Sequence, residues 1–270
     1  MKNRMAEKEL ADTLVRLAHE YPTSMVNEQL RNIPRIAFNI RLVLGSAGPV
    51  ARNELSICDI GGGIGLFSVG CAALGFKRVL LIDDFNDPVN QKVGDSIFSL
   101  HRKYGVSIVS RDVISTRICD SCRGFDVVTT FDSMEHWHHS PKKLFKEVMS
   151  GLKPGGTFIL SVPNCLNLKR RATVLLGMGK WSSMKDWYEL ELFRGHVREP
   201  DVDDLKYIAR DMGLCRVRIV GRNWMGHYST KSYIRVATRL VDLPLRLKPS
   251  FCSDLYLVGE KPISPKTTFD

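Results

Sequence analysis

Between residues 55 and 163, short apolar runs alternate with longer segments that are apolar on one side only. The apolar runs stand at 55–60, 78–82, 106–109, 125–131 and 157–162. The segments at 66–74, 88–104 and 141–152 have helical spacing, and the sequence KPGG caps the last of them. Short continuous apolar runs are typical of strands buried on both faces. The alternation therefore predicts an α/β fold, a doubly wound parallel sheet with helices on both faces.

The first 50 residues have a helical pattern of their own. Leucines at positions 10, 14 and 17 line one face of a helix predicted over 4–20, and a second helix is predicted over 25–44. A loop rich in glycine follows. We expect residues 1–50 to form a helical extension and residues 51–270 to form the main domain.

The pattern changes after residue 163. Residues 164–199 are irregular and rich in arginine, tryptophan and glycine. A helix is predicted over 200–213, with acidic residues in its first turn, where they suit the helix dipole. Two further strands are predicted at 215–220 and 254–258.

An amphipathic insertion, residues 223–252, separates these last two strands. Its apolar positions at helical spacing are Ile234, Ala237 and Val241, and its basic positions are Lys231, Arg235 and Arg239. This pattern predicts an amphipathic helix with a basic face. We expect the apolar face to pack on the sheet, although a basic amphipathic helix can also lie on a membrane surface, so peripheral membrane contact stays open.

Composition places the chain among globular proteins of a reducing compartment. Its 270 residues are 44% hydrophobic and 25% charged, enough for a substantial core. No apolar run reaches the roughly 18–20 residues of a transmembrane segment, and the N-terminus lacks the apolar stretch of a secretory signal. Seven cysteines are scattered, and Cys119 and Cys122 lack the second pair that a structural zinc site needs. We expect a cytoplasmic protein.

The net charge of +10 is concentrated in the C-terminal third. Residues 163–250 hold 17 Lys and Arg against 9 Asp and Glu, a net charge of +8. A basic surface favours nucleic acid, anionic lipid or phosphorylated substrates, and it can also be ordinary solvated surface. The charge leaves all of these open and specifies no oligomeric state.

A glycine-rich turn follows the first apolar run. It reads Asp59-Ile-Gly61-Gly-Gly63-Ile-Gly65 and precedes a predicted helix. Glycines allow a tight turn and a close approach to a ligand, and the helix N-terminus offers free N–H groups. The dinucleotide fingerprint needs a third glycine where this chain has Leu66. Since ligands of such sheets bind at the C-terminal ends of the strands, we expect a ligand site at this turn.

Together with later segments, this turn resembles the class I S-adenosylmethionine-dependent methyltransferases. The segments are DIGGGIG (59–65), LLIDD (80–84), RDV (111–113), FDVVTTFDSMEH (125–136) and LKPGGTFILSVPN (152–164). FRGHVREP (193–200) is similar to members that act on glycans and small molecules. The resemblance implies S-adenosylmethionine as cofactor and a Rossmann-like sheet, mostly parallel with a terminal antiparallel strand. It also implies an acceptor lid at 164–199.

The resemblance assigns the glycine turn to the methionine part of the cofactor. Gly61, Gly63 and Gly65 would let the turn pack against it. Asp59 would hold the ammonium group, directly or through water.

Further cofactor contacts are implied at the ends of the second and third strands. Asp83 would accept hydrogen bonds from both ribose hydroxyls, with Asp84 as a competitor for the role. Asp112 would contact the adenine amino group, and Val113 would bond the ring through its backbone. A turn-forming aspartate explains Asp112 nearly as well.

The residues after the fourth strand are expected at the reacting groups. Phe131 and Asp132 would border the transferred methyl group. A hydroxyl acceptor needs a base, and a histidine titrates near neutral pH. His136 is the first candidate base and His196 the second, while a histidine that only completes a hydrogen-bond network is the alternative for each.

A metal site is the alternative use of the same stretch. Asp132, Glu135 and His136 resemble the E-x-x-E-H motif of metal-assisted O-methyltransferases that act on quinone precursors and small RNA. Asp132 replaces the first Glu and shortens the reach by one methylene. Mixed oxygen and nitrogen ligands suit Mg, Mn or Zn. His138 and His139 are expected at the rim.

The segment 164–199 would form the lid over the acceptor. Its aromatic and basic side chains, which can stack on rings and hold anions, are Trp181, Trp187, Tyr188, Phe193, Lys169, Arg170, Arg171, Arg194 and Arg198. We expect O-methylation of a small-molecule or glycan hydroxyl. An RNA methyltransferase and a non-catalytic binding protein of the same fold are the alternatives, although FDSMEH differs from the (N/D)PP(Y/F) motif of many base N-methyltransferases. A nucleic-acid partner is therefore not expected.

Overall fold

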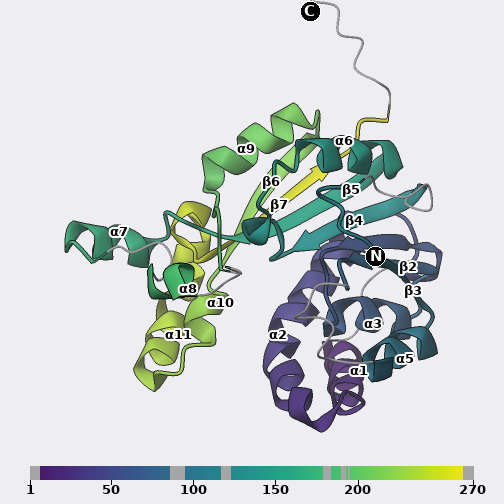
Figure 1. The fold of residues 1–270 in the computed structure, drawn as a ribbon, viewed down its shortest axis with the longest axis horizontal. Coiled ribbons are helices and arrows are strands. Elements are labelled where there is room, and N and C mark those ends of the chain that lie inside the picture. Colours follow the sequence, from purple (N-terminus) through teal and green to yellow (C-terminus); the bar gives the residue numbers. More distant parts are fainter. Residues whose placement is uncertain are drawn as a thin grey trace, which may run out of the picture. The chain divides into compact units, whose positions relative to one another are not determined.

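The fold is seen in a computed structural model that describes residues 7–85, 95–116, 123–178, 184–189, 193 and 195–263 (Figure 1). Its contacts divide the chain into two compact units. Unit 1 comprises residues 1–130, 142–159 and 260–270, and unit 2 comprises residues 131–141 and 160–259. Cys119, Cys122, Trp181 and Arg194 lie outside the described residues. The domain boundary expected near residue 50 stays a prediction.

Seven strands form one sheet in the order β3-β2-β1-β4-β5-β7-β6. Their bounds are β1 Ser56–Ile60, β2 Arg78–Asp83, β3 Val106–Ser110, β4 Phe125–Phe131, β5 Leu152–Pro163, β6 Cys215–Arg222 and β7 Asp254–Glu260. β1 pairs in parallel with β2 and β4, and β2 pairs in parallel with β3. The predicted fold class, a mostly parallel Rossmann-like sheet, is confirmed.

β7 is the predicted antiparallel strand. Near the start of β5, Gly155 N–H donates to Lys261 O (2.9 Å), and Lys261 N–H donates to Gly156 O (2.8 Å). Just past the other end of β5, Asn164 N–H donates to Ser253 O (2.8 Å), directly before β7. The start of one strand thus pairs with the end of the other. This pairing also corrects the sequence prediction that KPGG caps a helix, because these residues are already part of β5.

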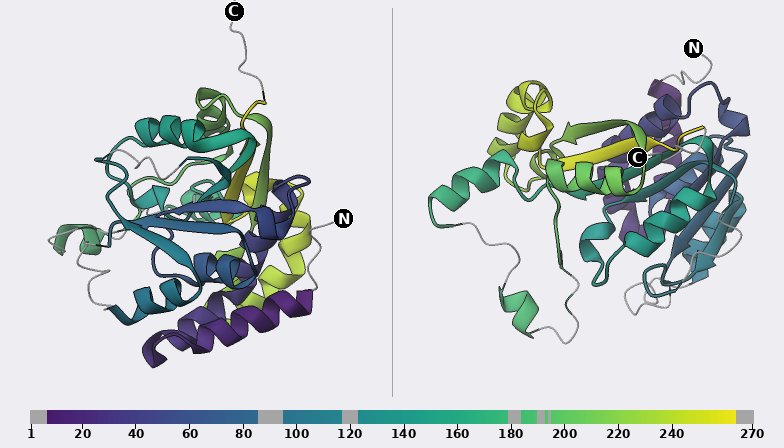
Figure 2. Two further views of the ribbon diagram at one scale, coloured as in Figure 1. Left: turned by 90° about the vertical axis from the view of Figure 1, so that its right-hand side faces the viewer. Right: turned by 90° about the horizontal axis from the view of Figure 1, so that it is seen from above.

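Helices cover both faces of the strands in unit 1. They are α1 Glu7–His19, α2 Thr23–Ser46, α3 Leu66–Ala73, α5 Asp95–Lys103 and α6 Lys142–Gly151, with a short 3-10 turn η1 Arg52–Glu54. α6 lies on the opposite side of the strands from α3 and α5 (Figure 2). At Gly70 of α3, a Cβ would lie 2.9 Å from Leu14 and 3.2 Å from Ile40, so α1 and α2 pack directly on this glycine.

Unit 2 is built on the far ends of β4 and β5, all of β6 and most of β7. Its helices are η3 Met134–His136, α7 Leu168–Leu175, α8 Met184–Glu189, α9 Val202–Asp211, α10 Trp224–His227, α11 Ser232–Arg246 and η4 Pro249–Phe251. Tyr256 of β7 is fully buried, and its hydroxyl accepts a hydrogen bond from Trp224 Nε1 (2.8 Å). Asp201 caps α9 through the backbone N–H groups of Asp203 and Asp204. Among the described residues, no helix has the length and apolarity that crossing a membrane requires.

The amphipathic helix is present and contacts β6 of the sheet, but two of its three predicted apolar positions are exposed. Val241 is 45% exposed and Ala237 is exposed, so another side of α11 makes this contact. The side that faces the rest of unit 2 is partly polar and includes Thr238 and the buried Asp242. Polar contacts from α10 and the preceding Asn223 select this side, as described below.

Candidate active site

The turn between β1 and α3 is shaped by three consecutive glycines. Gly61 (φ 69°) and Gly63 (φ 57°) adopt left-handed backbone conformations that favour glycine. A Cβ at Gly62 would overlap the carboxylate of Asp59, 2.7 Å from its Cγ, and would lie 3.0 Å from Leu81 Cδ1. Gly65 is the N-cap residue of α3. The turn therefore has no room for a side chain on its inner side.

Asp59 fastens this turn to the sheet. It is buried, and its carboxylate accepts hydrogen bonds from Ser68 Oγ of α3 and Thr129 Oγ1 of β4, each 2.8 Å long. Burial raises the pKa of Asp59 to about 6, the two hydroxyls lower it, and the charge of Asp83 raises it further. The contact predicted between Asp59 and the cofactor's ammonium group stays a prediction.

Asp83 stands at the end of β2, beside the same turn. Its half-buried carboxylate accepts hydrogen bonds from the backbone N–H of Gly63 at Oδ2 and of Asp84 at Oδ1, both 2.7 Å. The structure thus brings the glycine turn and the acid of the second strand together within unit 1. A narrow turn free of side chains next to a strand-end carboxylate fits a nucleoside cofactor with ribose hydroxyls.

At the end of β3, the structure places Asp112 in a turn. Its side chain is exposed and accepts hydrogen bonds from the backbone N–H groups of Ile114 (2.9 Å) and Ser115 (3.2 Å). Val113 beside it is buried. These contacts are those of a turn-forming aspartate, and the adenine contacts of both residues stay predictions.

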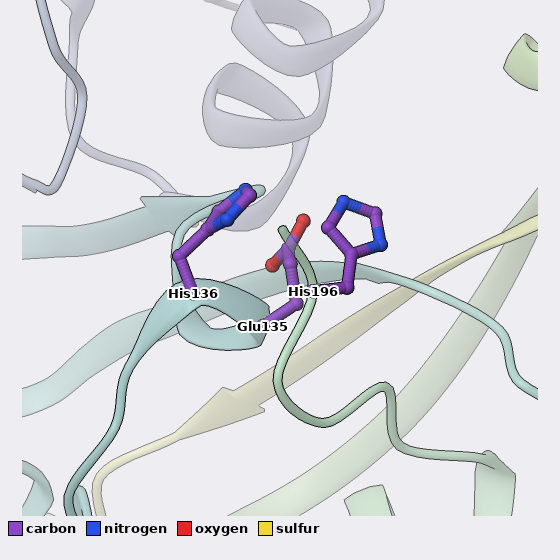
Figure 3. Close-up of side chains that lie close together, drawn as sticks. All are labelled: Glu135, His136 and His196. Carbon is purple, nitrogen blue, oxygen red and sulfur yellow. The ribbon is translucent and has the colours of Figure 1, made fainter. Parts of the chain in front are cut away.

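In unit 2, the segment after β4 meets the segment 195–200. The carbonyl oxygen of Glu135 accepts hydrogen bonds from the backbone N–H of Val197 (2.7 Å) and of Arg198 (3.4 Å). This pairing places the rings of His136 and His196 edge to face, with centroids 4.9 Å apart. Figure 3 shows the Glu135 carboxylate close to both rings.

His196 has a buried carboxylate partner. Its Nδ1 lies 2.6 Å from Oε1 of Glu199, a side chain that is only 3% exposed. Arg170 of α7 donates through Nη2 to the same carboxylate (3.0 Å). The hydrogen bond to Glu199 raises the pKa of His196, burial opposes this, and the negative charge of Glu135 adds to the rise. The three residues form a histidine–carboxylate pair that an arginine holds in place.

Asp132, the first residue after β4, is hydrogen-bonded to Ser161 of β5. Its backbone has an unusual positive φ of 50°, its N–H donates to Ser161 O (3.0 Å), and its Oδ1 accepts from Ser161 Oγ (3.2 Å). Phe131 before it is half-buried beside Tyr256, with ring centroids 6.2 Å apart. Their contacts with the transferred methyl group stay predictions.

Three donors in unit 2 lie close enough to share one cation. Ligand atoms of Glu135, His136 and His196 all lie within 4.8 Å of one another. This set differs from the one expected from the sequence, because His196 takes the place of Asp132, which bonds Ser161 instead. His138 and His139 are exposed, as expected of rim residues.

A sequence profile describing a methyltransferase domain matches residues 3–217. The chain belongs to the methyltransferase domain family. It is a methyltransferase that uses S-adenosylmethionine as cofactor, and it acts on an acceptor substrate. No curated protein sequence matches it significantly.

Solved methyltransferase structures share the fold of the chain. An S-adenosylmethionine-dependent methyltransferase from Thermotoga maritima is 17% identical, with a TM-score of 0.52 over 93% of this chain and 99% of that one. Magnesium protoporphyrin IX methyltransferase from Synechocystis, with S-adenosylhomocysteine bound, is 14% identical, with a TM-score of 0.54 over 93% of each chain. Phosphoethanolamine N-methyltransferase 2 from Haemonchus contortus, bound to S-adenosylmethionine, is 18% identical, with a TM-score of 0.51 over 83% of this chain and 52% of that one. At these identities the likeness concerns the fold.

Two residues of the methyltransferase were missed by sequence reasoning. Gly62 was not distinguished from its neighbours, although it is the glycine packed most tightly in the turn. Glu199 was overlooked as a partner of His196, although it lies only three positions further along the chain. The spacing His196-x-x-Glu199 was the available signal.

Proposed function

We propose that the methyltransferase transfers the methyl group of S-adenosylmethionine to a hydroxyl group of a small molecule or glycan. The pairing of His196 with the buried Glu199 supports this proposal. Attack by a hydroxyl oxygen requires removal of its proton, whereas positioning supplies much of the remaining rate. When bound, S-adenosylmethionine would supply an electrophilic methyl group with its own leaving group, and the residues of this chain would remove the proton of the acceptor hydroxyl.

His196 is the proposed general base. If Nδ1–H donates to Glu199, the lone pair of the neutral ring is on Nε2, which takes the proton of the acceptor hydroxyl. Glu199 fixes this tautomer and stabilises the imidazolium that results, while Arg170 holds the carboxylate in place. This reverses the order expected from the sequence, and His136, at the edge of the His196 ring, becomes the second candidate.

The choice of acceptor rests on exposed aromatic surface in the predicted lid. Trp187 and Tyr188 of α8 are 59% and 79% exposed. Exposed aromatic rings of this kind stack on flat or sugar-like ligands. They support an acceptor that presents rings and hydroxyl groups.

An acceptor screen on the purified enzyme tests the proposal. Methyl transfer is followed as S-adenosylhomocysteine formed from S-adenosylmethionine, with panels of phenols, sugars and glycans, amines and RNA. We expect hydroxyl compounds to be methylated, and mass spectrometry to place the new methyl on oxygen. Methylation confined to nitrogen, or to RNA, would contradict the proposal.

Variants of the pair test the role of its members. His196→Gln and Glu199→Gln should each lower kcat by at least tenfold, while the Kd for S-adenosylmethionine changes less than twofold. His138→Gln is the matched control, because it removes an exposed histidine of the same stretch. An unchanged kcat in His196→Gln would exclude this base.

A further inference from the structure

The outward side of α11 is a regular apolar stripe. Its side chains recur every three or four residues and are all exposed: Tyr233 (66%), Val236 (55%), Leu240 (77%), Leu243 (72%) and Leu247 (84%). That spacing places them along one face of the helix. Large apolar stripes on a helix surface mark interaction sites.

Polar contacts hold α11 with this stripe outward. Asp242 on the inner side is buried, accepts a hydrogen bond from Asn223 Nδ2 (2.9 Å) and forms an ion pair with Arg246. At Gly226 of α10, a Cβ would lie 2.8 Å from Cγ2 of Thr238, so α10 packs tightly against α11. Rolling the helix to bury its leucines would expose these polar partners and disrupt the packing. The exposed stripe is therefore part of the folded unit.

The charge around the stripe is uniformly positive. Residues 231–248 contain five Lys and Arg and a single acidic residue, Asp242, which is buried. The exposed charged side chains of this segment are Lys231, Arg239 and Lys248. An apolar stripe flanked by cations is complementary to an anionic lipid surface, where each Lys or Arg contributes about 1 kcal/mol, roughly a fivefold gain in binding.

The end of α7, in the same unit, carries a second group of exposed apolar residues. Its exposed apolar residues are Val174 (61%), Leu175 (88%), Leu176 (69%) and Met178 (62%). α7 and α11 lie at the same end of unit 2 in Figure 1 and in the right-hand view of Figure 2. Exposed Lys169 and Arg171 add positive charge to α7.

We propose that α11, supported by the end of α7, docks the methyltransferase on an anionic membrane surface. The helix lies in the plane of the interface, with its leucines among the acyl chains and its cations at the lipid phosphates. This attachment is independent of the chemistry proposed at His196.

Vesicle sedimentation tests the proposal on the full-length protein. Vesicles contain phosphatidylcholine alone or with about 30% phosphatidylglycerol, an anionic fraction chosen to attract basic segments. We expect at least tenfold stronger partitioning to the anionic vesicles in low salt, and weakening of this preference in high salt. Absence of binding to anionic vesicles in low salt would overturn the proposal.

Two exposed substitutions identify the surface. Leu240→Ser with Leu243→Ser should weaken binding to anionic vesicles by at least tenfold, because two leucines no longer bury their apolar side chains among the acyl chains. Tyr207→Ser on α9 is the matched control, an apolar residue of similar exposure (63%) outside the surface. Unchanged binding of the double variant would overturn the assignment to α11. Circular dichroism verifies that each variant is folded.

A reporter on the stripe separates lipid from protein partners. The chain has four tryptophans of its own, so the emission of Leu243→Trp is compared with that of the unsubstituted chain under the same conditions. The emission added by the new tryptophan should shift to the blue with anionic vesicles and not with phosphatidylcholine alone. Sedimentation velocity without lipid tests whether the stripe binds a second copy of the chain. Self-association that disappears in the Leu240→Ser, Leu243→Ser variant would assign the stripe to a second copy of the chain and overturn the lipid proposal.

Discussion

Replacing Asp59 by Asn should make the free energy of unfolding depend less on pH. The folded pKa of Asp59 is about 6, against an ordinary value of 3.8. Between these pH values, the folded chain holds a proton that the unfolded chain has released. Stability therefore falls as pH rises through this window. Because one pKa unit corresponds to 1.36 kcal/mol, the buried carboxylate costs roughly 3 kcal/mol above pH 6.

Asparagine has the shape of the protonated acid and can still bond Ser68 and Thr129. About half of the cost is already present at pH 5, so the remaining ~1.4 kcal/mol appears between pH 5 and pH 8. The free energy of unfolding of Asp59→Asn, relative to the natural chain, should rise by about that amount over this range. We expect the gain to be largest at pH 8.

Urea unfolding followed by circular dichroism, without cofactor, measures this difference at pH 5, 6, 7 and 8. Asp12→Asn is the control, since it removes an exposed carboxylate of α1. A stability difference for Asp59→Asn that stays constant across the pH range, or that shrinks toward pH 8, would refute the reasoning. Either result would mean that contacts other than those with Ser68 and Thr129 stabilise the charged carboxylate of Asp59.

Three further predictions concern the two sites. Gly62→Ala should destabilise the protein by about 1–3 kcal/mol and weaken S-adenosylmethionine binding, because its Cβ overlaps Asp59. Denaturation measures the first effect and calorimetric titration the second. Gly45→Ala, with no atom within 4 Å of its added Cβ, should change neither quantity. Glu199→Gln should shift the acidic limb of the kcat–pH profile to lower pH, because the hydrogen bond that raises the pKa of His196 is weakened; an unmoved limb would assign it to another group. Dialysis against EDTA should leave kcat unchanged if His196 acts as a base, whereas loss of activity with rescue by Mn²⁺ or Zn²⁺ would assign Glu135, His136 and His196 to a metal.

The sheet was predictable because its buried strands are visible in the sequence as short, mainly apolar segments. β1 and β2 consist mainly of apolar residues, and most of their residues are buried. The glycine turn was also predictable. The left-handed backbone conformations at Gly61 and Gly63 favour glycine, so the turn appears in the sequence as a cluster of glycines. These features can be predicted from the residues of each segment alone.

The histidine pair and the orientation of α11 depend on long-range contacts. His196 reaches Glu135 because the backbone of Val197 bonds a carbonyl about sixty positions earlier, and backbone bonds leave no mark in the sequence. Helical periodicity predicted that α11 is amphipathic. It did not predict which side faces inward, because that was determined by Asp242 and its partner Asn223.

The hydrogen bonds from Val197 and Arg198 to the carbonyl of Glu135 bear on how this enzyme can diversify. They anchor the proposed base to the end of β4 through main-chain atoms, which almost any sequence can supply. Under the proposed function, exchanges at Trp187 and Tyr188 of α8 alter acceptor selection while these main-chain bonds keep the base in place. The side chains proposed to select the acceptor are thus distinct from the bonds that hold the proposed base.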